Sequence, residues 1–294
     1  MNMIFIRNYQ NLMLFFTFFL FWLSIQFGEV VEDFLAYVMI ISLGILHGAN
    51  DLLILSIKDK KDKNFIKNLI IYVSIIILCL IIYMFSSFIA ILLFVLLSSY
   101  HFGEEHLSKK INVNVLFNSL YFLAYGVFIF SLIFYQSTAD VDIIMKELTS
   151  LTFTKAQIEI SLLLSAIFLF AGSLYLILTK RNKSKIFIEE IFYLVLLFLV
   201  FKTSSLILGF AIYFIFWHSI PSIIHQVEFI SGNLNKKSIF FYVKKALIYW
   251  SISIVGLLIL YQLVPQIELF ATVVFVILFA VTAPHAWVMH KMKS

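Results

Sequence analysis

Ten apolar stretches, each close to the length of a helix that crosses a bilayer, follow one another along the chain. They run approximately over residues 12–27, 34–57, 68–85, 88–102, 115–135, 158–179, 188–201, 206–230, 246–264 and 269–290. Because 63% of the 294 residues are hydrophobic and the mean hydropathy is +1.04, no soluble domain of this length could bury so much apolar surface. The sequence therefore predicts an all-α, polytopic transmembrane helical bundle of about ten spans.

The positions of the lysine and arginine residues indicate how such a bundle is oriented. Eighteen of these 21 residues fall near the N-terminus or just after the second, fourth, sixth, eighth and tenth stretches. The opposite loops carry the acidic residues Glu29, Glu32, Asp33, Asp140, Asp142, Glu147 and Glu268. By the positive-inside rule we expect both termini in the cytoplasm and the protein in the cell (inner or plasma) membrane. The net charge of +5 then reflects topology and does not indicate a nucleic-acid partner.

The chain shows no sign of a second domain or of a removable leader. Arg7 precedes the first apolar stretch and no small-residue cleavage site follows it, which predicts an uncleaved first span. No Gly/Ser-rich or Pro-rich linker interrupts the sequence, and the longest loop, about 136–157, is modest. We therefore expect residues 1–294 to form a single integral membrane domain. Cys79 is the only cysteine, so an internal disulfide is impossible.

All seven histidines lie in four short motifs on the even-numbered stretches. The motifs are ILHGAND (His47), SSYHFGEEH (His101, His106), FWHSIPSIIH (His218, His225) and TAPHAWVMH (His285, His290). These stretches run in the same direction across the membrane, so their histidines lie at similar, cytoplasm-leaning depths. Four helices can thus present imidazoles to one volume inside the bundle, and imidazole-rich sites without thiolates suit iron, copper, zinc or nickel. His290 stands beside Lys291 and is expected at the membrane interface.

Asp51 and Glu228 are the only carboxylates that we expect deep in these stretches. A metal-bound histidine commonly donates its second ring N–H to a carboxylate, and either residue could accept it. Asp51 follows His47 by four residues, so on a helix the two would share one face. The alternative for this pair is a helix–helix hydrogen bond, with Gly48 allowing close packing.

Aromatic residues flank these motifs, among them Tyr100, Trp217 and Trp287. Most of them are expected to be ordinary packing residues. An apolar, aromatic-lined pocket beside a metal would nevertheless suit a long hydrocarbon substrate.

Taken together, HGAND, YHFGEEH, FWHSIPS and TAPH resemble the Brp/Blh family, the bacterial β-carotene 15,15′-dioxygenases. The resemblance spans nearly the whole chain, because the motifs run from His47 to His285 in the family's order. It implies an integral membrane enzyme that depends on Fe2+ and uses O2 to split β-carotene at its central double bond into two retinals. It also implies that His47, His101 and His218 are iron ligands. Retinal released into the lipid bilayer could supply a rhodopsin.

Two departures from the family's pattern concern the fourth iron ligand. Ser222 stands where the family has a second histidine, and His106 stands where it usually has an aspartate. We therefore expect His106 to be the fourth ligand, which requires the helix to loosen or end at Gly103, since i+5 turns His106 about 140° away from His101.

Two further histidines, or water, are alternatives for this fourth position. His285 matches a family histidine outside the usual ligand set, so we expect it beside a ligand or in the pocket wall. His225 lies on the same helix as His218 but about 10 Å further along the axis, a long reach for one shared metal.

Two other functions compete with this interpretation. The spacings His101-x4-His106 and His285-x4-His290 resemble the first histidine box of membrane di-iron desaturases and hydroxylases. No His-His pair occurs, however, and seven histidines are fewer than that family typically uses. Outside the enzymes, intramembrane His, Asp and Glu residues also build metal or proton transporters. Formation of retinal would distinguish the dioxygenase from both.

Overall fold

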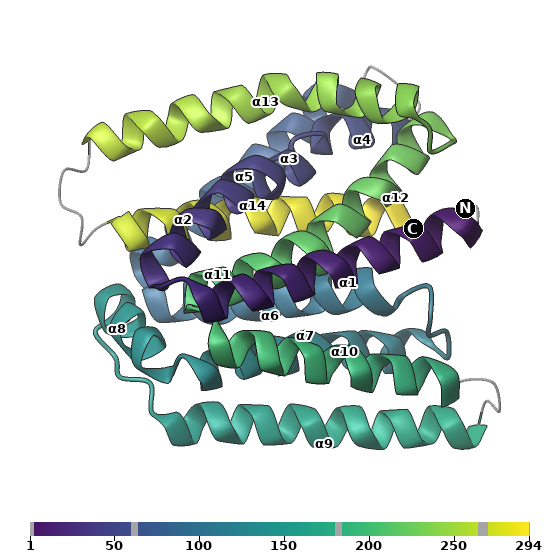
Figure 1. The fold of residues 1–294 in the computed structure, drawn as a ribbon. Helices are drawn as coiled ribbons and strands as arrows, with labels where there is room; N and C mark the ends of the chain where they lie inside the picture. The colour runs from purple at the N-terminus through teal and green to yellow at the C-terminus, as the bar shows by residue number, and fades with distance from the viewer. Residues whose placement is uncertain (1–2, 60–63, 180–183, 264–269, 294) are drawn as a thin grey trace.

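The computed structural model describes residues 3–59, 64–179, 184–263 and 270–293, and every regular element in these ranges is helical (Figure 1). The first half contains α1 (Met3–Gln26), α2 (Glu29–Met39), η1 (Ile40–Gly44), α3 (Ile45–Gly48), α4 (Asp51–Lys58), α5 (Phe65–Phe85), α6 (Ser87–Leu107) and α7 (Val115–Gln136). The second half contains α8 (Thr138–Thr149), α9 (Lys155–Thr179), α10 (Ser184–Thr203), α11 (Leu206–Ile212), η3 (Tyr213–Ser219), α12 (Ile220–Ser231), α13 (Lys236–Leu263) and α14 (Phe270–Lys293). The prediction of an all-helical fold is confirmed for this part of the chain.

Eight helical segments of the described residues are long and apolar enough to cross a membrane. They are Glu29–Lys58, Phe65–Phe85, Ser87–Leu107, Val115–Gln136, Lys155–Thr179, Leu206–Ser231, Lys236–Ile259 and Phe275–Lys293. The chain is therefore a multi-pass membrane protein. The two other predicted spans are present as helices α1 and α10, which run alongside the rest of the bundle in Figure 1 but are not among the eight.

The segment α11–η3–α12 lies at the centre of the bundle. Its residues from Leu208 to Trp217 are almost entirely buried, with Ala211, Ile212 and Ile215 at 0% exposure. A helix that is apolar all round can be stable only when other helices surround it. One of these neighbours is α1, whose Tyr9 hydroxyl donates to the carbonyl of Phe216. This central position brings η3 close to the three other helices that carry the histidines of the site.

Two glycines let α6 and α7 approach each other more closely than any larger residue would allow. A Cβ atom added at Gly103 would lie 1.9 Å from the carbonyl oxygen of Phe122, and one added at Gly126 would lie 2.0 Å from that of Ser99. Small residues at crossing points are typical of helix pairs in membranes, where close packing replaces the hydrophobic driving force. The contact fixes the rotation of α6 about its own axis and therefore the direction in which His101 points.

Helix α8 occupies most of the region that we predicted to be a loop, about residues 136–157. The interpretation as a loop was wrong, because the charged residues of this stretch concealed an amphipathic pattern. Val141, Met145 and Leu148 lie at i, i+4 and i+7, which places them on one helical face. This face packs against Ile91 of α6 and Ile158 of α9. The buried stripe was thus readable in the sequence.

Candidate metal centre

His47 lies between two irregular turns of its helix. The π-helical segment η1 comes just before the short helix α3 that carries His47, and α3 ends at Gly48. A turn at Ala49 and Asn50 follows, and helix α4 then begins at Asp51. π-Helical turns are rare and occur frequently at functional sites, because the extra residue redirects the side chains that follow. Gly44 permits the turn to pack tightly, since a Cβ there would lie 2.9 Å from the Phe214 ring.

His218 lies within a second π-helical segment. All seven residues of η3 are buried, and His218 is only 1% exposed. Pro221, in the first turn of α12, has no backbone N–H to donate to the preceding turn, which favours an irregular hydrogen-bond pattern there. Two of the histidine motifs therefore share the same local feature, a π-helical segment at or just before the histidine.

The other two histidines that approach this region come from more regular helices. His101 lies on α6, six residues before the end of the helix and next to the glycine contact with α7. His285 lies on α14, directly after Pro284 inside the helix. A proline in a helix interior removes one backbone hydrogen bond and bends the helix. All four side chains point toward the bundle interior, with exposures of 7% or less.

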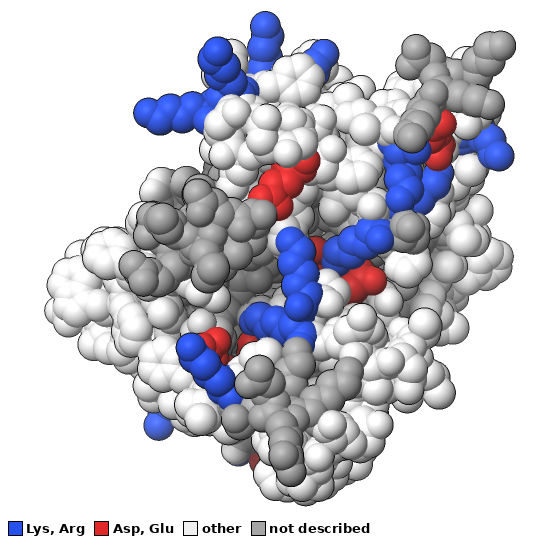
Figure 2. All heavy atoms as spheres, turned by 90° about the vertical axis from the view of Figure 1, so that its right-hand side faces the viewer, with Lys and Arg blue, Asp and Glu red and all other residues white. Residues whose placement is uncertain are grey.

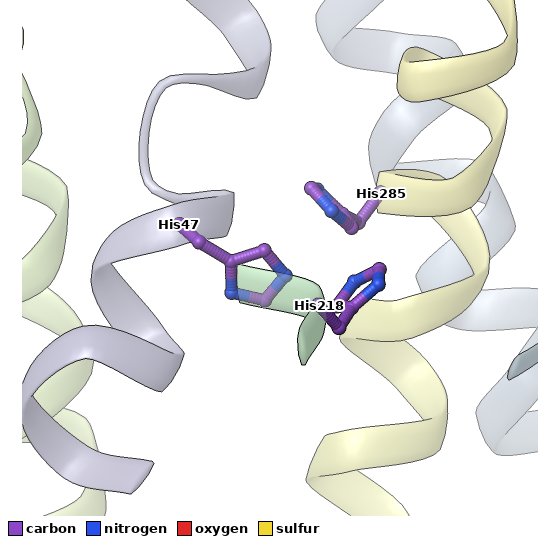
Figure 3. A group of neighbouring side chains, drawn as sticks. All are labelled: His47, His218 and His285. Carbon is purple, nitrogen blue, oxygen red and sulfur yellow. The ribbon is translucent and has the colours of Figure 1, made fainter. Parts of the chain in front are cut away.

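The four imidazole rings of His47, His101, His218 and His285 form one compact cluster. The ring centroids are 4.6 Å apart for His47 and His285, 4.7 Å for His101 and His218, 5.2 Å for His101 and His285, and 5.5 Å for His47 and His218. Each of the three imidazoles of His47, His218 and His285 offers one nitrogen within 4.8 Å of the other two (Figure 3). Nitrogen atoms at these separations could hold a single metal ion.

Most of the ring nitrogens in this cluster have no hydrogen-bond partner among the described residues. Both nitrogens of His101, both of His218 and the Nε2 of His285 are buried and unpaired. An unsatisfied buried polar atom costs about 1–3 kcal/mol, so five of them in one place need an explanation. A metal ion bound between the rings would satisfy one nitrogen of each. The donor set of neutral imidazoles therefore fits a divalent transition metal.

The remaining ring nitrogens of His47 and His285 are held by hydrogen bonds that leave their Nε2 atoms available. His47 Nδ1 donates to the carbonyl of Gly44, and His285 Nδ1 lies 2.9 Å and 3.1 Å from the two carboxylate oxygens of Asp51. Asp51 also accepts a hydrogen bond from the Tyr72 hydroxyl at 3.1 Å. Such bonds fix the tautomer of a metal-binding histidine and orient its ring.

The arrangement of Asp51 differs in one respect from the expectation. We expected His47 and Asp51 to share one face of a continuous helix. The helix is interrupted between them, and the Asp51 carboxylate contacts His285 of α14 and not His47. Asp51 does pair with a histidine, as expected, but this histidine comes from another helix.

Three of the sequence-predicted site residues lie outside the cluster. His106 Nε2 bonds to Glu190 of α10 at 2.8 Å, and its ring stacks on Tyr125. His225 Nδ1 bonds to Glu105 at 2.5 Å. Glu228 is half-buried on α12 and has no hydrogen bond to the cluster in the described part of the chain.

The structure contradicts the helix break that a ligand role for His106 required. Helix α6 continues as a regular α-helix through Gly103 to Leu107. An unbroken helix leaves His106 rotated away from His101 and facing α10. Gly103 instead serves the close contact with α7.

Sequence reasoning also missed two buried carboxylates on α6. Glu104 and Glu105 are 7% and 4% exposed, so the statement that only Asp51 and Glu228 lie deep in these helices was wrong. Lys293 forms ion pairs with both glutamates, which explains how they can be buried. Glu105 could have been found, because it follows His101 by four residues and therefore shares its face of α6.

Phenylalanine rings form the apolar wall beside the cluster. Phe102 lies 4.4 Å from His218, and Phe214 lies 5.3 Å from His47, both measured between ring centroids. Trp217 faces away from the cluster, toward α1, where its Nε1 donates to Thr17. The cluster is therefore enclosed by hydrocarbon on this side.

The fold and the cluster together define a class: a multi-pass membrane protein with a candidate metal centre of histidines buried in its helical bundle. A family model described as "BCD: Beta-carotene 15,15'-dioxygenase" matches residues 38–293 of the chain. Because this match covers most of the 294 residues, the chain belongs to the β-carotene 15,15′-dioxygenase family. No curated protein and no solved structure matches it. The protein is thus an oxidoreductase that cleaves β-carotene at the centre to give retinal.

Proposed function

We propose that one Fe2+ ion is held by four imidazoles, those of His47, His101, His218 and His285. The observation that carries this proposal is the convergence of four buried imidazoles, three of which have unpaired nitrogens. Ligand sets of this kind suit iron, copper, zinc and nickel, but zinc has no redox chemistry and cannot activate O2. The resemblance to the iron-dependent Brp/Blh enzymes favours iron. When bound, the iron would supply the activation of O2 for the cleavage reaction.

The surrounding residues exclude water and orient the metal-binding rings. Phe102 and Phe214 cover one side of the cluster, and the Asp51 carboxylate is taken up by the Nδ1–H of His285. A dry, apolar site protects a reactive oxygenated substrate from water. Gly44 and Asp51 hold the Nδ1–H groups of His47 and His285, so these rings would face the metal with Nε2.

The substrate and product of this reaction are matched to a site inside the bilayer. β-Carotene is entirely hydrocarbon and dissolves in lipid, so it can approach a pocket in the bundle without crossing water. Together with O2 it forms the substrate pair, and the two retinals produced also partition into the bilayer. We propose that they are taken up there by a retinal-binding membrane protein such as a rhodopsin.

Removal and replacement of the metal tests this function. We expect protein purified in detergent and treated with a chelator to form no retinal from β-carotene, and added Fe2+ to restore the activity. Zn2+ should occupy the same imidazoles and block the restoration by Fe2+, since it binds them without redox chemistry. Chromatography of the extracted retinoids measures the product. Full activity in metal-free protein would contradict the proposal.

The same evidence favours a dioxygenase over the competing functions. A di-iron site would need His106 and His290 near its metals, but His106 binds Glu190 and the His290 side chain is 63% exposed. The family match decides against a transporter as the main function.

We further propose that the single domain of residues 1–294 crosses the cell membrane ten times, with both termini in the cytoplasm. Helices α1 and α10 would add two spans to the eight candidates. Both ends of the described chain lie at the same end of the bundle (Figure 1), and Lys and Arg side chains gather on the face there (Figure 2). This distribution agrees with the positive-inside rule.

A reporter fusion tests this topology. An alkaline phosphatase fused after Ser294 should be inactive, because that enzyme folds only outside the cytoplasm, and a fluorescent protein fused there should fold. The same reporters fused within α8, at Glu147, should give the opposite result. An active phosphatase after Ser294 would contradict the proposed orientation.

A further inference from the structure

The interrupted helix at His47 leaves one backbone carbonyl that needs a hydrogen-bond donor from elsewhere. Helix α3 ends at Gly48, where the backbone N–H of Ala49 donates to the carbonyl of Leu46 at 3.2 Å, and the carbonyl of His47 has no backbone donor among the described residues. Inside a membrane-spanning segment no water is available, so an unsatisfied carbonyl destabilises the fold. The carbonyl of His47 accepts a hydrogen bond from the side-chain Nε2 of Gln226 at 2.9 Å. The side-chain amide of Gln226, on helix α12, thus replaces the hydrogen bond that is missing in the interrupted helix at His47.

The Tyr242 hydroxyl determines which way the Gln226 amide is turned. It has one proton to donate, and its nearest acceptor is the Gln226 Oε1 at 2.8 Å, whereas the carbonyls of His47 and Leu46 lie at 3.4 and 3.5 Å. An amide carries its acceptor on one side and its donors on the other. Donation to Oε1 therefore turns the Nε2 group toward His47 and also toward Ser222, whose hydroxyl lies 3.1 Å away.

A second bond joins α13 to the same turn. The side-chain Nδ2 of Asn50, one residue before α4, donates to the carbonyl of Tyr242 at 3.0 Å. The four residues of this network, Asn50, Ser222, Gln226 and Tyr242, are each 0% exposed. Helix α13 otherwise presents much of its surface outward, with Ile248 at 61% and Ile252 at 64% exposure. A fully buried tyrosine on such a helix indicates a specific role for its hydroxyl.

We propose that Tyr242 and Gln226 are positioning residues that fix His47 at the iron site by holding its backbone carbonyl. The hydroxyl orients the amide, the amide holds the carbonyl, and the His47 side chain follows the backbone of its turn. This inference rests on the proposed role of His47 as an iron ligand. It assigns to Tyr242 and Gln226 a function in setting the coordination geometry, although neither side chain touches the metal position.

Substitution of the single hydroxyl tests the proposal. Tyr242→Phe removes one oxygen atom and keeps the ring, so the fold is expected to survive. We expect its affinity for Co2+, used as a spectroscopic probe in metal-free protein, to fall about 10-fold, at the lower end of the 10–100-fold typical for residues that support a metal ligand. The visible absorption of bound Co2+ should also change, because it reports ligand geometry. A merely structural role would lower the melting temperature and leave that spectrum unchanged.

A second variant and a matched control complete the experiment. Gln226→Glu still accepts from Tyr242 but has no N–H for His47, so we expect a loss of affinity at least as large. The double variant should be no weaker than Gln226→Glu alone, because the two residues act as a unit. The control is Tyr121→Phe on α7, which removes another buried hydroxyl, bonded at 2.8 Å to Ser173 of α9, a helix that carries none of the four histidines. It should bind Co2+ as the wild type does.

The outcomes separate this proposal from the one on which it rests. If Tyr242→Phe binds Co2+ with unchanged affinity and spectrum while His47→Ala does not bind it, the positioning role is wrong and the ligand role stands. If His47→Ala also binds Co2+ normally, the ligand role itself fails. Should Gln226→Glu not fold, Tyr242→Phe decides the question alone.

Discussion

Replacement of His285 by alanine should abolish both retinal formation and iron binding, whereas replacement of His106 should leave iron bound. This result is expected because His285 contributes one of the four converging rings, and its Nε2 is buried without a partner among the described residues. His106 instead bonds to Glu190 and lies against Tyr125. Its loss removes a partner from a buried carboxylate, which lowers stability without removing a metal ligand. Lys110 still pairs with Glu190 and limits that effect.

Iron content per folded protein is the decisive measurement for this pair. The variants are expressed in a bacterial host that makes β-carotene, purified as monodisperse protein, and analysed for iron and for extracted retinal. His47→Ala, His101→Ala and His218→Ala should behave like His285→Ala, since the four rings lie together and are proposed to hold one metal. His290→Ala serves as the surface control and should keep most of the activity, because that side chain is 63% exposed.

The opposite result would restore the hypothesis that His106 is the fourth ligand. Iron-replete His285→Ala together with iron-free His106→Ala would require helix α6 to break at Gly103 in the working enzyme. Such a break would separate the Gly103–Phe122 contact that holds α6 against α7. The two variants therefore distinguish the fourth ligand without reference to the other three.

The sequence predicted which helices carry the site, because the depth of a residue in a membrane follows from counting along its span. Four charge-rich loops and the two termini, all on one predicted side, place His47, His101 and His218 at comparable depths on parallel helices, and these three rings do meet. The resemblance to the Brp/Blh family singled out the same three. The depth of a residue along its span and the direction of that span can both be read from a single sequence.

The fourth ring could not be chosen in this way, because the rotation of a helix about its axis depends on its neighbours. His106 lies at a suitable depth, but α6 is fixed by the glycine contact with α7, which turns His106 toward α10. His285 enters the cluster because α14 packs against α4, α5 and α6, an arrangement set by the whole bundle. The π-helical turns η1 and η3 add a local rotation that no periodicity of the sequence indicates.

Substitution of Asp51 by asparagine should weaken iron binding or activity by about 10–100-fold without abolishing it, as is typical for carboxylates that support a metal-binding histidine. Asparagine retains the shape and one acceptor oxygen, so His285 Nδ1–H still has a partner and Tyr72 can still donate. The negative charge is lost, however, and a hydrogen bond to a charged acceptor is roughly twice as strong as one between neutral groups. His285 then becomes a less basic and less firmly oriented ligand.

Competition with a chelator of known affinity measures the Fe2+ binding of this variant, and the rate of retinal formation at saturating iron measures its activity. Asp142→Asn is the matched control: that carboxylate lies on α8, accepts from the backbone of Phe153, and has its pKa held below the usual range by the hydrogen bond from the Lys146 ammonium. The Asp142→Asn variant undergoes the same change of charge but has no contact with the cluster, so we expect it to change the stability of the protein and not its iron binding. If Asp51→Asn binds iron and turns over like the wild type, the Asp51–His285 bond serves only to join α4 to α14. Complete loss of iron from Asp51→Asn, equal to the loss expected for His285→Ala, would instead indicate that the carboxylate itself is a ligand.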